Sequence, residues 1–236
     1  MSDMDDFVKL LEEGADRVQL EAAASRLLTG DAALTGPPPP RLIAVLTEDN
    51  TTLDEPLLDL VRTWSRPEMS RALLDALIAA PAVDTRRQAG WLLKSVLAVE
   101  HRGEAIDRVL DTGENAEVRR WLIEALERFV FGHALGWDEL DPVVTVLAGE
   151  SAGELRAGLA LLLGTLPWRA SNTALLEPLL LDDNHEVVSA AAHTLARHPD
   201  AVATLAPETL DRLRVHANPM MRQSAALLDA SLRAKP

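Results

Sequence analysis

Cysteine and tyrosine are both missing from this sequence of 236 residues. Without cysteine, the chain has no disulfide bond, no thiolate nucleophile and no zinc site built on thiolates. Aromatic residues make up only 3% of the chain, as five Trp and three Phe. This share of aromatic residues is well below that of an average soluble protein.

Positive charge is also scarce, because the formal net charge is −14 at pH 7. This charge opposes binding to a phosphate backbone unless basic residues gather locally. Residues 1–65 hold 13 acidic and 5 basic residues, so this first quarter carries −8 of the −14. We expect it to face a basic partner, or simply to form a well-solvated acidic surface.

Long apolar runs are absent as well. No stretch approaches the roughly 18–20 apolar residues of a membrane span. The acidic N-terminus, MSDMDDFVKLLEE, lacks the apolar segment of a signal peptide. The expectation is a cytoplasmic protein that does not bind a membrane.

What the chain does contain is a repeat. The copies are DTRRQAGWLLK (84–94, the weakest), AEVRRWLIEAL (116–126), GELRAGLALLL (153–163), HEVVSAAAHTL (185–195) and PMMRQSAALLD (219–229). They align on Thr85, Val118, Leu155, Val187 and Met221, at separations of 33, 37, 32 and 34 residues. Self-similarity at this period is typical of stacked helical repeats.

Each copy has the pattern of a packed helix. Apolar residues follow Val118 at Leu122, Ile123 and Leu126, which is the stripe of a helix that packs on its neighbours. Small residues recur in the middle of the stripe, at Ala89, Gly158, Ala191 and Ala225. Asn115, Asn184 and Asn218 precede their anchors by three residues and are suited to cap the helix N-terminus, and Pro219 suits a first helical turn.

Shorter amphipathic segments lie between the copies and predict a first helix for each pair. They are 68–80, 103–111, 138–148, 173–181 and 200–215. No segment alternates with period two, so no sheet is expected.

The signatures D-D-N-H-E-V-V, E-N-A-E-V-R-R and A-N-P-M-M-R resemble those of the HEAT-repeat family across residues 68–234. The family carries an Arg early in the second helix, matched by Arg86, Arg119, Arg156 and Arg222, whereas Val188 departs from it. Its Asp five residues before the anchor is matched by Asp182 and partly by Glu150, whereas Gly113 and His216 depart. The resemblance implies an all-α fold, a right-handed α-α superhelix of about six antiparallel helix pairs.

We expect one solenoid domain over residues 1–236. Residues 1–35 would form an acidic N-terminal helical cap, and the prolines of 36–40 a stiff connector rather than a recognition motif. Residues 41–236 would form the repeats, with one further helix pair over 41–64. Terminal repeats need an altered outer face because they lack a neighbour on that side.

No motif in the sequence predicts chemistry. His185 and His193 are eight residues apart, so HEVVSAAAH lacks the four-residue spacing of a zinc-binding HExxH helix. GESAGELRAG lacks both the Lys and the preceding strand of a phosphate-binding loop. We predict no catalytic residue, no metal site and no cofactor.

A solenoid exposes an extended surface, which favours binding of another protein. The stretch RFVFGHALGW (128–137) concentrates aromatics at a joint, where they would either pack in the core or anchor a partner. The predicted partner-binding residues are Arg86, Arg119, Arg120, Arg156, Arg222, Trp91, Trp121, Phe131, His133 and Trp137.

The sequence thus predicts a non-enzymatic scaffold or adaptor, with an inhibitor or immunity protein for a basic partner as its specific form. The alternative is a nucleic-acid enzyme similar to the HEAT-like alkylpurine DNA glycosylases, a family in which a basic concave face grips DNA and aromatics and a catalytic Asp complete the site. The row of arginines favours this alternative, whereas the net charge of −14 opposes it.

Overall fold

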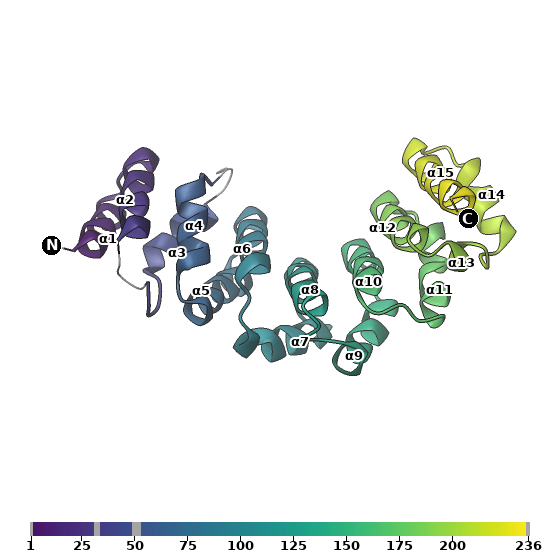
Figure 1. The fold of residues 1–236 in the computed structure, drawn as a ribbon, viewed down its shortest axis with the longest axis horizontal. Coiled ribbons are helices and arrows are strands. Elements are labelled where there is room, and N and C mark those ends of the chain that lie inside the picture. Colours follow the sequence, from purple (N-terminus) through teal and green to yellow (C-terminus); the bar gives the residue numbers. More distant parts are fainter. Residues whose placement is uncertain (1, 31–33, 49–52, 235–236) are drawn as a thin grey trace. The chain divides into compact units, whose positions relative to one another are not determined.

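The computed structural model describes residues 2–30, 34–48 and 53–234 (Figure 1). Every regular element in these ranges is a helix and none is a strand, which confirms the predicted all-α class. The chain divides into two compact units, Met1–Asp107 and Arg108–Pro236, and the division falls within α7 (Arg102–Leu110). Each unit is described by itself.

Unit 1 begins with the acidic segment. Its helices before α7 are α1 (Asp3–Glu13), α2 (Arg17–Thr29), α3 (Pro40–Thr47), α4 (Glu55–Thr63), α5 (Arg66–Ala79), α6 (Val83–Val96) and the 3₁₀ helix η1 (Val99–His101). Capping boxes start the first two, with Ser2 and Asp5 at α1 and Asp16 and Gln19 at α2. Helix α2 packs on α4, α4 packs on α6, and α5 packs on α6.

The proline-rich segment of unit 1 is held against the corner between α4 and α5. The indole nitrogen of Trp64 donates a hydrogen bond to the carbonyl of Gly36 at 2.8 Å, and the amide of Ser65 donates to Leu34 at 2.7 Å. Gly36 has a φ of 79°, which favours glycine. Helix α3 then starts at Pro40, whose fixed φ suits a first helical position.

Unit 2 also consists of helices joined by short turns. Its elements after α7 are α8 (Ala116–Phe131), α9 (Trp137–Ala148), α10 (Gly153–Thr165), α11 (Ser171–Leu176), the 3₁₀ helix η2 (Pro178–Leu181), α12 (His185–Ala196), α13 (Pro199–Val202), α14 (Pro207–Arg214) and α15 (Pro219–Arg233). We call α2, α4, α6, α8, α10, α12 and α15 the second helices, because each is the last helix of its pair or group along the chain.

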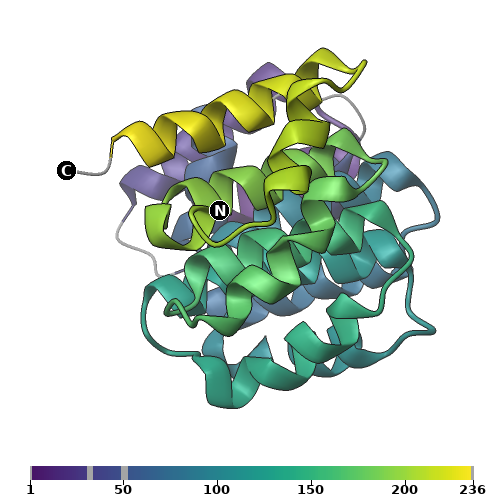
Figure 2. The same ribbon diagram turned by 90° about the vertical axis from the view of Figure 1, so that its right-hand side faces the viewer.

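The second helices of unit 2 pack in succession, α8 on α10, α10 on α12 and α12 on α15. In Figures 1 and 2 the colours of these helices run from teal at α8 to yellow at α15. The first helices α9 and α11 both lie on one side of this row (Figure 1). The anchors Val118, Leu155, Val187 and Met221 are all buried within it. The anchors are therefore core positions of a packed helical row, as the apolar stripe predicted.

The predicted helix starts are confirmed at three asparagines. The side-chain oxygens of Asn115, Asn184 and Asn218 each accept a hydrogen bond of 2.9 Å from the backbone N–H two residues later. Each bond satisfies a donor that the first helical turn leaves free. Pro219 occupies the first position of α15, as expected.

The small residues in the middle of the stripe allow close contact between these helices. Gly158 of α10 lies against Ile123 of α8, where an added Cβ would come within 3.3 Å of the Ile123 Cδ1. Ala191 and Ala225 are buried at the corresponding places in α12 and α15. In unit 1, Ala89 is likewise buried in α6.

Two predicted first helices are wrong in detail. The segment 173–181 is divided into α11 and η2, because Pro178 has no N–H with which to continue an α-helix. The segment 200–215 is divided into α13 and α14, which is a new helix that begins at Pro207.

Among the described residues, no helix has both the length and the apolar character that a membrane span requires.

Candidate partner-binding surfaces

Three of the predicted arginines contact the loop that leads into their own helix. Arg86, Arg156 and Arg222 are each the fourth residue of a second helix, and each donates through Nη1 to the carbonyls five and six residues earlier. The two bonds measure 2.7 and 3.0 Å for Arg86 and 2.7 and 2.8 Å for Arg222. These guanidinium groups therefore fix the loops, and this use explains their regular spacing along the sequence.

Arg156 also reaches the next repeat. Its Nε and Nη2 contact the two carboxylate oxygens of Asp182 at 2.6 and 3.0 Å, a bidentate arrangement. Hydrogen bonding to Arg156 is the main reason why the pKa of Asp182 lies below its usual value. The pair joins α10 to the loop before α12.

Arg119 makes the equivalent contact one repeat earlier, with Glu150 at 2.6 Å, and its Nε donates to the carbonyl of Val109 at 2.8 Å. Its side chain is only 2% exposed, so Arg119 takes part in packing within unit 2 rather than in its outer surface. At the junction between α12 and α15, Val188 stands at the position of the Arg and His216 at the position of the acid. Both members of the Arg–acid pair are therefore absent from this junction.

Trp91 is the most exposed of the predicted tryptophans. It lies on α6 with 47% of its surface accessible, although an indole of this size is ordinarily well buried. Its side chain borders a groove of about 230 Å³ between α4 and α6, which we call the Trp91 groove. The groove is lined by Leu58, Val61, Arg62, Trp91, Leu92, Lys94 and Ser95.

The Trp91 groove combines an apolar floor with cationic edges. Arg62 contacts Asp59 at 2.9 Å and Glu55 at 3.2 Å, and these hydrogen bonds raise the pKa of its guanidinium. Lys94 follows Trp91 by one turn of α6 and brings a second cation to the rim. An apolar side chain of a partner would be covered by the indole while polar groups at the edge fix its orientation.

Trp121 differs from Trp91 because it is only 8% exposed. The guanidinium of Arg120 lies 5.3 Å from the centre of its ring and contacts Glu124 at 3.3 Å. Arg120 and Trp121 are therefore brought together, as neighbours on α8, with Arg120 as the more accessible of the two.

The joint RFVFGHALGW separates into exposed and buried aromatics. Phe131, the last residue of α8, is 66% exposed, and His133 is exposed in the following turn with a left-handed φ of 55°. Trp137 starts α9 and is buried, with its Nε1 donating to the carbonyl of Pro167 at 2.7 Å. Arg169 lies 4.2 Å from the Trp137 ring, a cation–π contact that the sequence reasoning missed.

A second aromatic pair lies in unit 2. Trp168 and His198 stack with ring centres 3.8 Å apart and planes 17° apart. Burial, together with the charge of Arg197, lowers the pKa of His198. Neither residue was predicted as functional. The two are 30 residues apart in the sequence, so no local pattern predicts that they stack.

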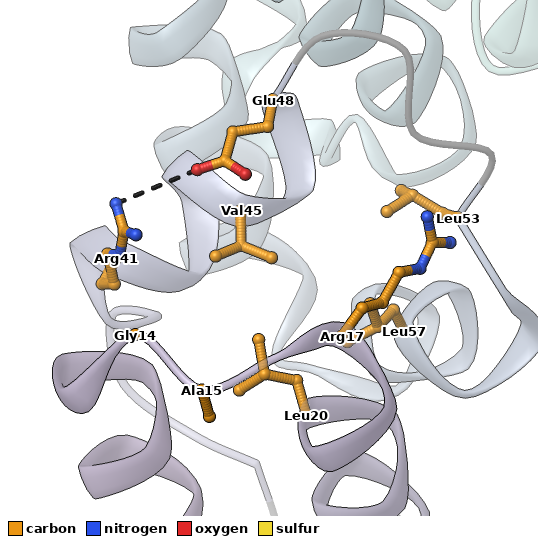
Figure 3. Close-up of a pocket in the computed structure, with 9 residues that line it drawn as sticks. All are labelled: Gly14, Ala15, Arg17, Leu20, Arg41, Val45, Glu48, Leu53 and Leu57. Carbon is orange, nitrogen blue, oxygen red and sulfur yellow. Dashed lines mark ion pairs between the residues drawn. The ribbon is translucent and has the colours of Figure 1, made fainter.

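A cleft near the N-terminus lies between α2, α3 and the start of α4 (Figure 3). It measures about 240 Å³ and has an apolar floor of Leu20, Val45 and Leu57. Arg17 and Arg41 stand at its sides, but Arg17 pairs with Glu21 at 2.7 Å and Arg41 with Glu48 at 3.9 Å. Both cations are thus engaged within unit 1.

Across residues 2–30, 34–48 and 53–234, no three His, Asp or Glu side chains come together as metal ligands. No protein-family model matches the chain, and a search of curated proteins finds no significant match.

The ten predicted residues thus fall into three groups. Arg86, Arg156 and Arg222 stabilise loops, Arg119, Trp121 and Trp137 are buried, and the accessible ones are Trp91, Arg120, Phe131 and His133. Arg86 and Trp91 belong to unit 1 and the other eight to unit 2. Leu58, Arg62 and Lys94, which complete the Trp91 groove, were missed because only the packing of α4 on α6 brings them together.

Proposed function

We propose that the chain is a non-enzymatic scaffold or adaptor, built as a HEAT-like helical array, that binds another protein through the exposed surface of its second helices. The observation that carries the proposal is Trp91, whose indole stays 47% exposed beside a groove with an apolar floor. Exposed tryptophans of this kind are strongly enriched among the residues that dominate interface energies.

The charge of the chain supports a specific form of this function, the inhibition or neutralisation of a basic protein. A net charge of −14 attracts a cationic partner over several ångströms and accelerates its association. Exposed or partly exposed acids add to this charge, namely Glu154 and Glu186 in the first turns of α10 and α12 and Asp183 in the loop before α12. In this form of the proposal the acidic surface steers the partner and Trp91 supplies short-range affinity.

The test is affinity capture from a lysate of the source cells with the wild-type chain, Trp91→Ala and Val99→Ala. Val99 is 56% exposed in η1 and lies outside the Trp91 groove, so it is the matched control for loss of an exposed apolar side chain. Removal of a central interface Trp costs about 2 kcal/mol or more, which lowers affinity about 30-fold. We expect Trp91→Ala to lose a stoichiometric protein partner that Val99→Ala retains.

Bound nucleic acid is quantified in the same eluates. A protein partner retained equally by Trp91→Ala would refute the role of the Trp91 groove. Salt-sensitive nucleic acid without any protein partner would overturn the adaptor function and favour a nucleic-acid enzyme. Circular dichroism of the three proteins verifies that the substitutions leave the helices intact.

A further inference from the structure

Helices α10, α12 and α15 of unit 2 run in the same direction, side by side. Gly153 at the start of α10 lies against Asn184 at the start of α12, and further along Thr194 Oγ1 donates to the carbonyl of Ala160 at 2.9 Å. Near the other end, Ser231 Oγ donates to Ala196 at 2.8 Å. Corresponding residues of the three helices therefore lie at the same level.

Two leucines and a histidine occupy corresponding positions of these helices. Leu161, His193 and Leu227 each follow their anchor by six residues, and Leu161 is 40% exposed. Met220, at the start of α15, is 44% exposed and borders a groove of about 140 Å³ between α12 and α15. We define the neutral face as Leu161, Ser189, His193, Met220, Gln223 and Leu227.

The neutral face carries no Asp, Glu, Lys or Arg, in a chain of which 25% of the residues are charged. All residues of α10, α12 and α15 are described, and the charged residues nearest to the face, Glu154, Glu186 and Arg197, lie at its edges. Arg156 and Arg222 contact the loops before their helices, and Asp229 pairs with Arg214 at 2.5 Å. A ligand that covers Leu161 and Met220, which are 40% and 44% exposed, would remove apolar surface from water.

The two edges of the neutral face have opposite charge. Glu154 and Glu186 are each the second residue of their helix, so they lie at the edge formed by the helix N-termini. Arg197 follows α12 at the opposite edge and is exposed. A ligand of this face therefore meets negative charge along one side and positive charge along the other.

We propose that the neutral face binds an amphipathic α-helix of a protein partner, laid across α10, α12 and α15, with basic residues on the flank that faces Glu154 and Glu186. Two interhelix spacings of about 9 Å separate Leu161 from Leu227, which matches about 12 residues of a helix. The apolar stripe of such a helix would cover Leu161, Met220 and Leu227. The inference rests on the proposed binding of a protein, but it does not depend on Trp91.

The experiment measures fluorescence anisotropy of labelled peptides of about 18 residues, roughly five helical turns, with the full-length chain. One peptide carries a leucine stripe with Lys along one flank, a second has Glu in place of Lys, and a third has the first composition scrambled to remove the stripe. We expect the Lys-flanked peptide to bind with a Kd below about 100 µM and at least about tenfold more tightly than the others.

Leu161→Glu and Met220→Glu should each weaken binding of the Lys-flanked peptide at least about tenfold. Val215→Glu is the matched control, because Val215 is 83% exposed in the loop before α15 and should leave binding unchanged. Circular dichroism checks the fold of each variant. Equal binding by wild type and Leu161→Glu, or no binding of any peptide, would overturn the proposal.

Self-association is followed by sedimentation of the free chain. A dimer that Leu161→Glu or Met220→Glu dissociates would identify a second copy as the occupant of the neutral face and overturn the partner helix. Peptide binding that survives Trp91→Ala would support the neutral face even where capture from the lysate fails, so the two proposals are tested separately.

Discussion

Arg156 links three parts of unit 2 through one guanidinium group. It donates to the loop carbonyls before its own helix and forms a bidentate pair with Asp182 in the loop before α12. Asp182 also accepts a hydrogen bond of 2.8 Å from the amide of Asn184, the residue that caps α12. Because its side chain is only 9% exposed, solvent screens these contacts weakly.

We predict that Asp182→Asn lowers the free energy of unfolding by about 1–3 kcal/mol at pH 7, because the substitution leaves the guanidinium of Arg156 without its charged partner. Urea denaturation at pH 7 measures the loss. Asp183→Asn is the control, since Asp183 is exposed and should change stability by less than about 0.5 kcal/mol. Equal effects of the two substitutions would contradict a stabilising role for the pair.

The same pair predicts a dependence on pH. The pKa of Asp182 is lower in the folded chain than its unfolded value of about 3.9, so its stabilisation is complete above that value. It is lost as the pH falls through the lowered folded pKa. The difference in stability between wild type and Asp182→Asn should therefore shrink below about pH 4.

At the scale of helices, the sequence pattern predicted type and start better than it predicted exposure. Asn115, Asn184 and Asn218 marked their helices because capping is a local interaction of a few residues. The exposure of the tryptophans could also have been predicted from helical phase. Trp121 follows its anchor by three residues and is buried, whereas Trp91 follows its anchor by six and is exposed.

Other features of the candidate sites had no such local signal. The Trp91 groove needs Leu58 of α4 beside α6, and the Trp168–His198 stack needs two connecting segments to meet. The divided helices around Pro178 and before Pro207 were missed because their apolar spacing continues across the interruption. Packing, rather than periodicity, decides these details.

Close contact between α10 and α12 gives a prediction at the same scale. A Cβ on Gly164 would come within 2.6 Å of Thr194 Oγ1 and would also meet the guanidinium of Arg197. We expect Gly164→Ala to lower the free energy of unfolding by about 1–3 kcal/mol, despite the higher helix propensity of alanine. Thermal or urea denaturation provides the measurement.

Gly103→Ala is the matched substitution, because Gly103 lies in α7 and an added Cβ there meets no other atom within 4 Å. It should leave stability unchanged or raise it by up to about 1 kcal/mol. If both alanine variants were equally stable, α10 and α12 would have room to separate, and close packing at Gly164 would not limit stability.

At the scale of the whole chain, negative charge is the dominant property. A net charge of −14 at pH 7 produces repulsion within the folded chain, since both units consist of helices that expose acidic side chains. Counter-ions screen this repulsion, because the Debye length falls from about 30 Å at 0.01 M salt to about 8 Å at 0.15 M.

We therefore predict that raising NaCl from about 0.01 M to about 0.15 M at pH 7 increases the Tm by about 2–4 °C, corresponding to about 1 kcal/mol for a chain of this size. Differential scanning calorimetry measures the shift. Near the isoelectric point of about 4.8 the net repulsion vanishes, and the salt effect should disappear with it. A Tm that falls with salt at pH 7 would mean that attractive ion pairs outweigh the repulsion.

The contacts of Arg86, Arg156 and Arg222 restrict where residues can be inserted into or deleted from the sequence. In each case the two acceptor carbonyls belong to the two residues just before the helix cap, so cap, carbonyls and arginine form a short unit of fixed register. An insertion inside this unit would break both bonds, whereas one placed upstream leaves them intact. The anchors are nevertheless 32 to 37 residues apart. Insertions and deletions between repeats are thus confined to the first helices and the turns that lead into them. The start of each of these second helices can be duplicated as one unit.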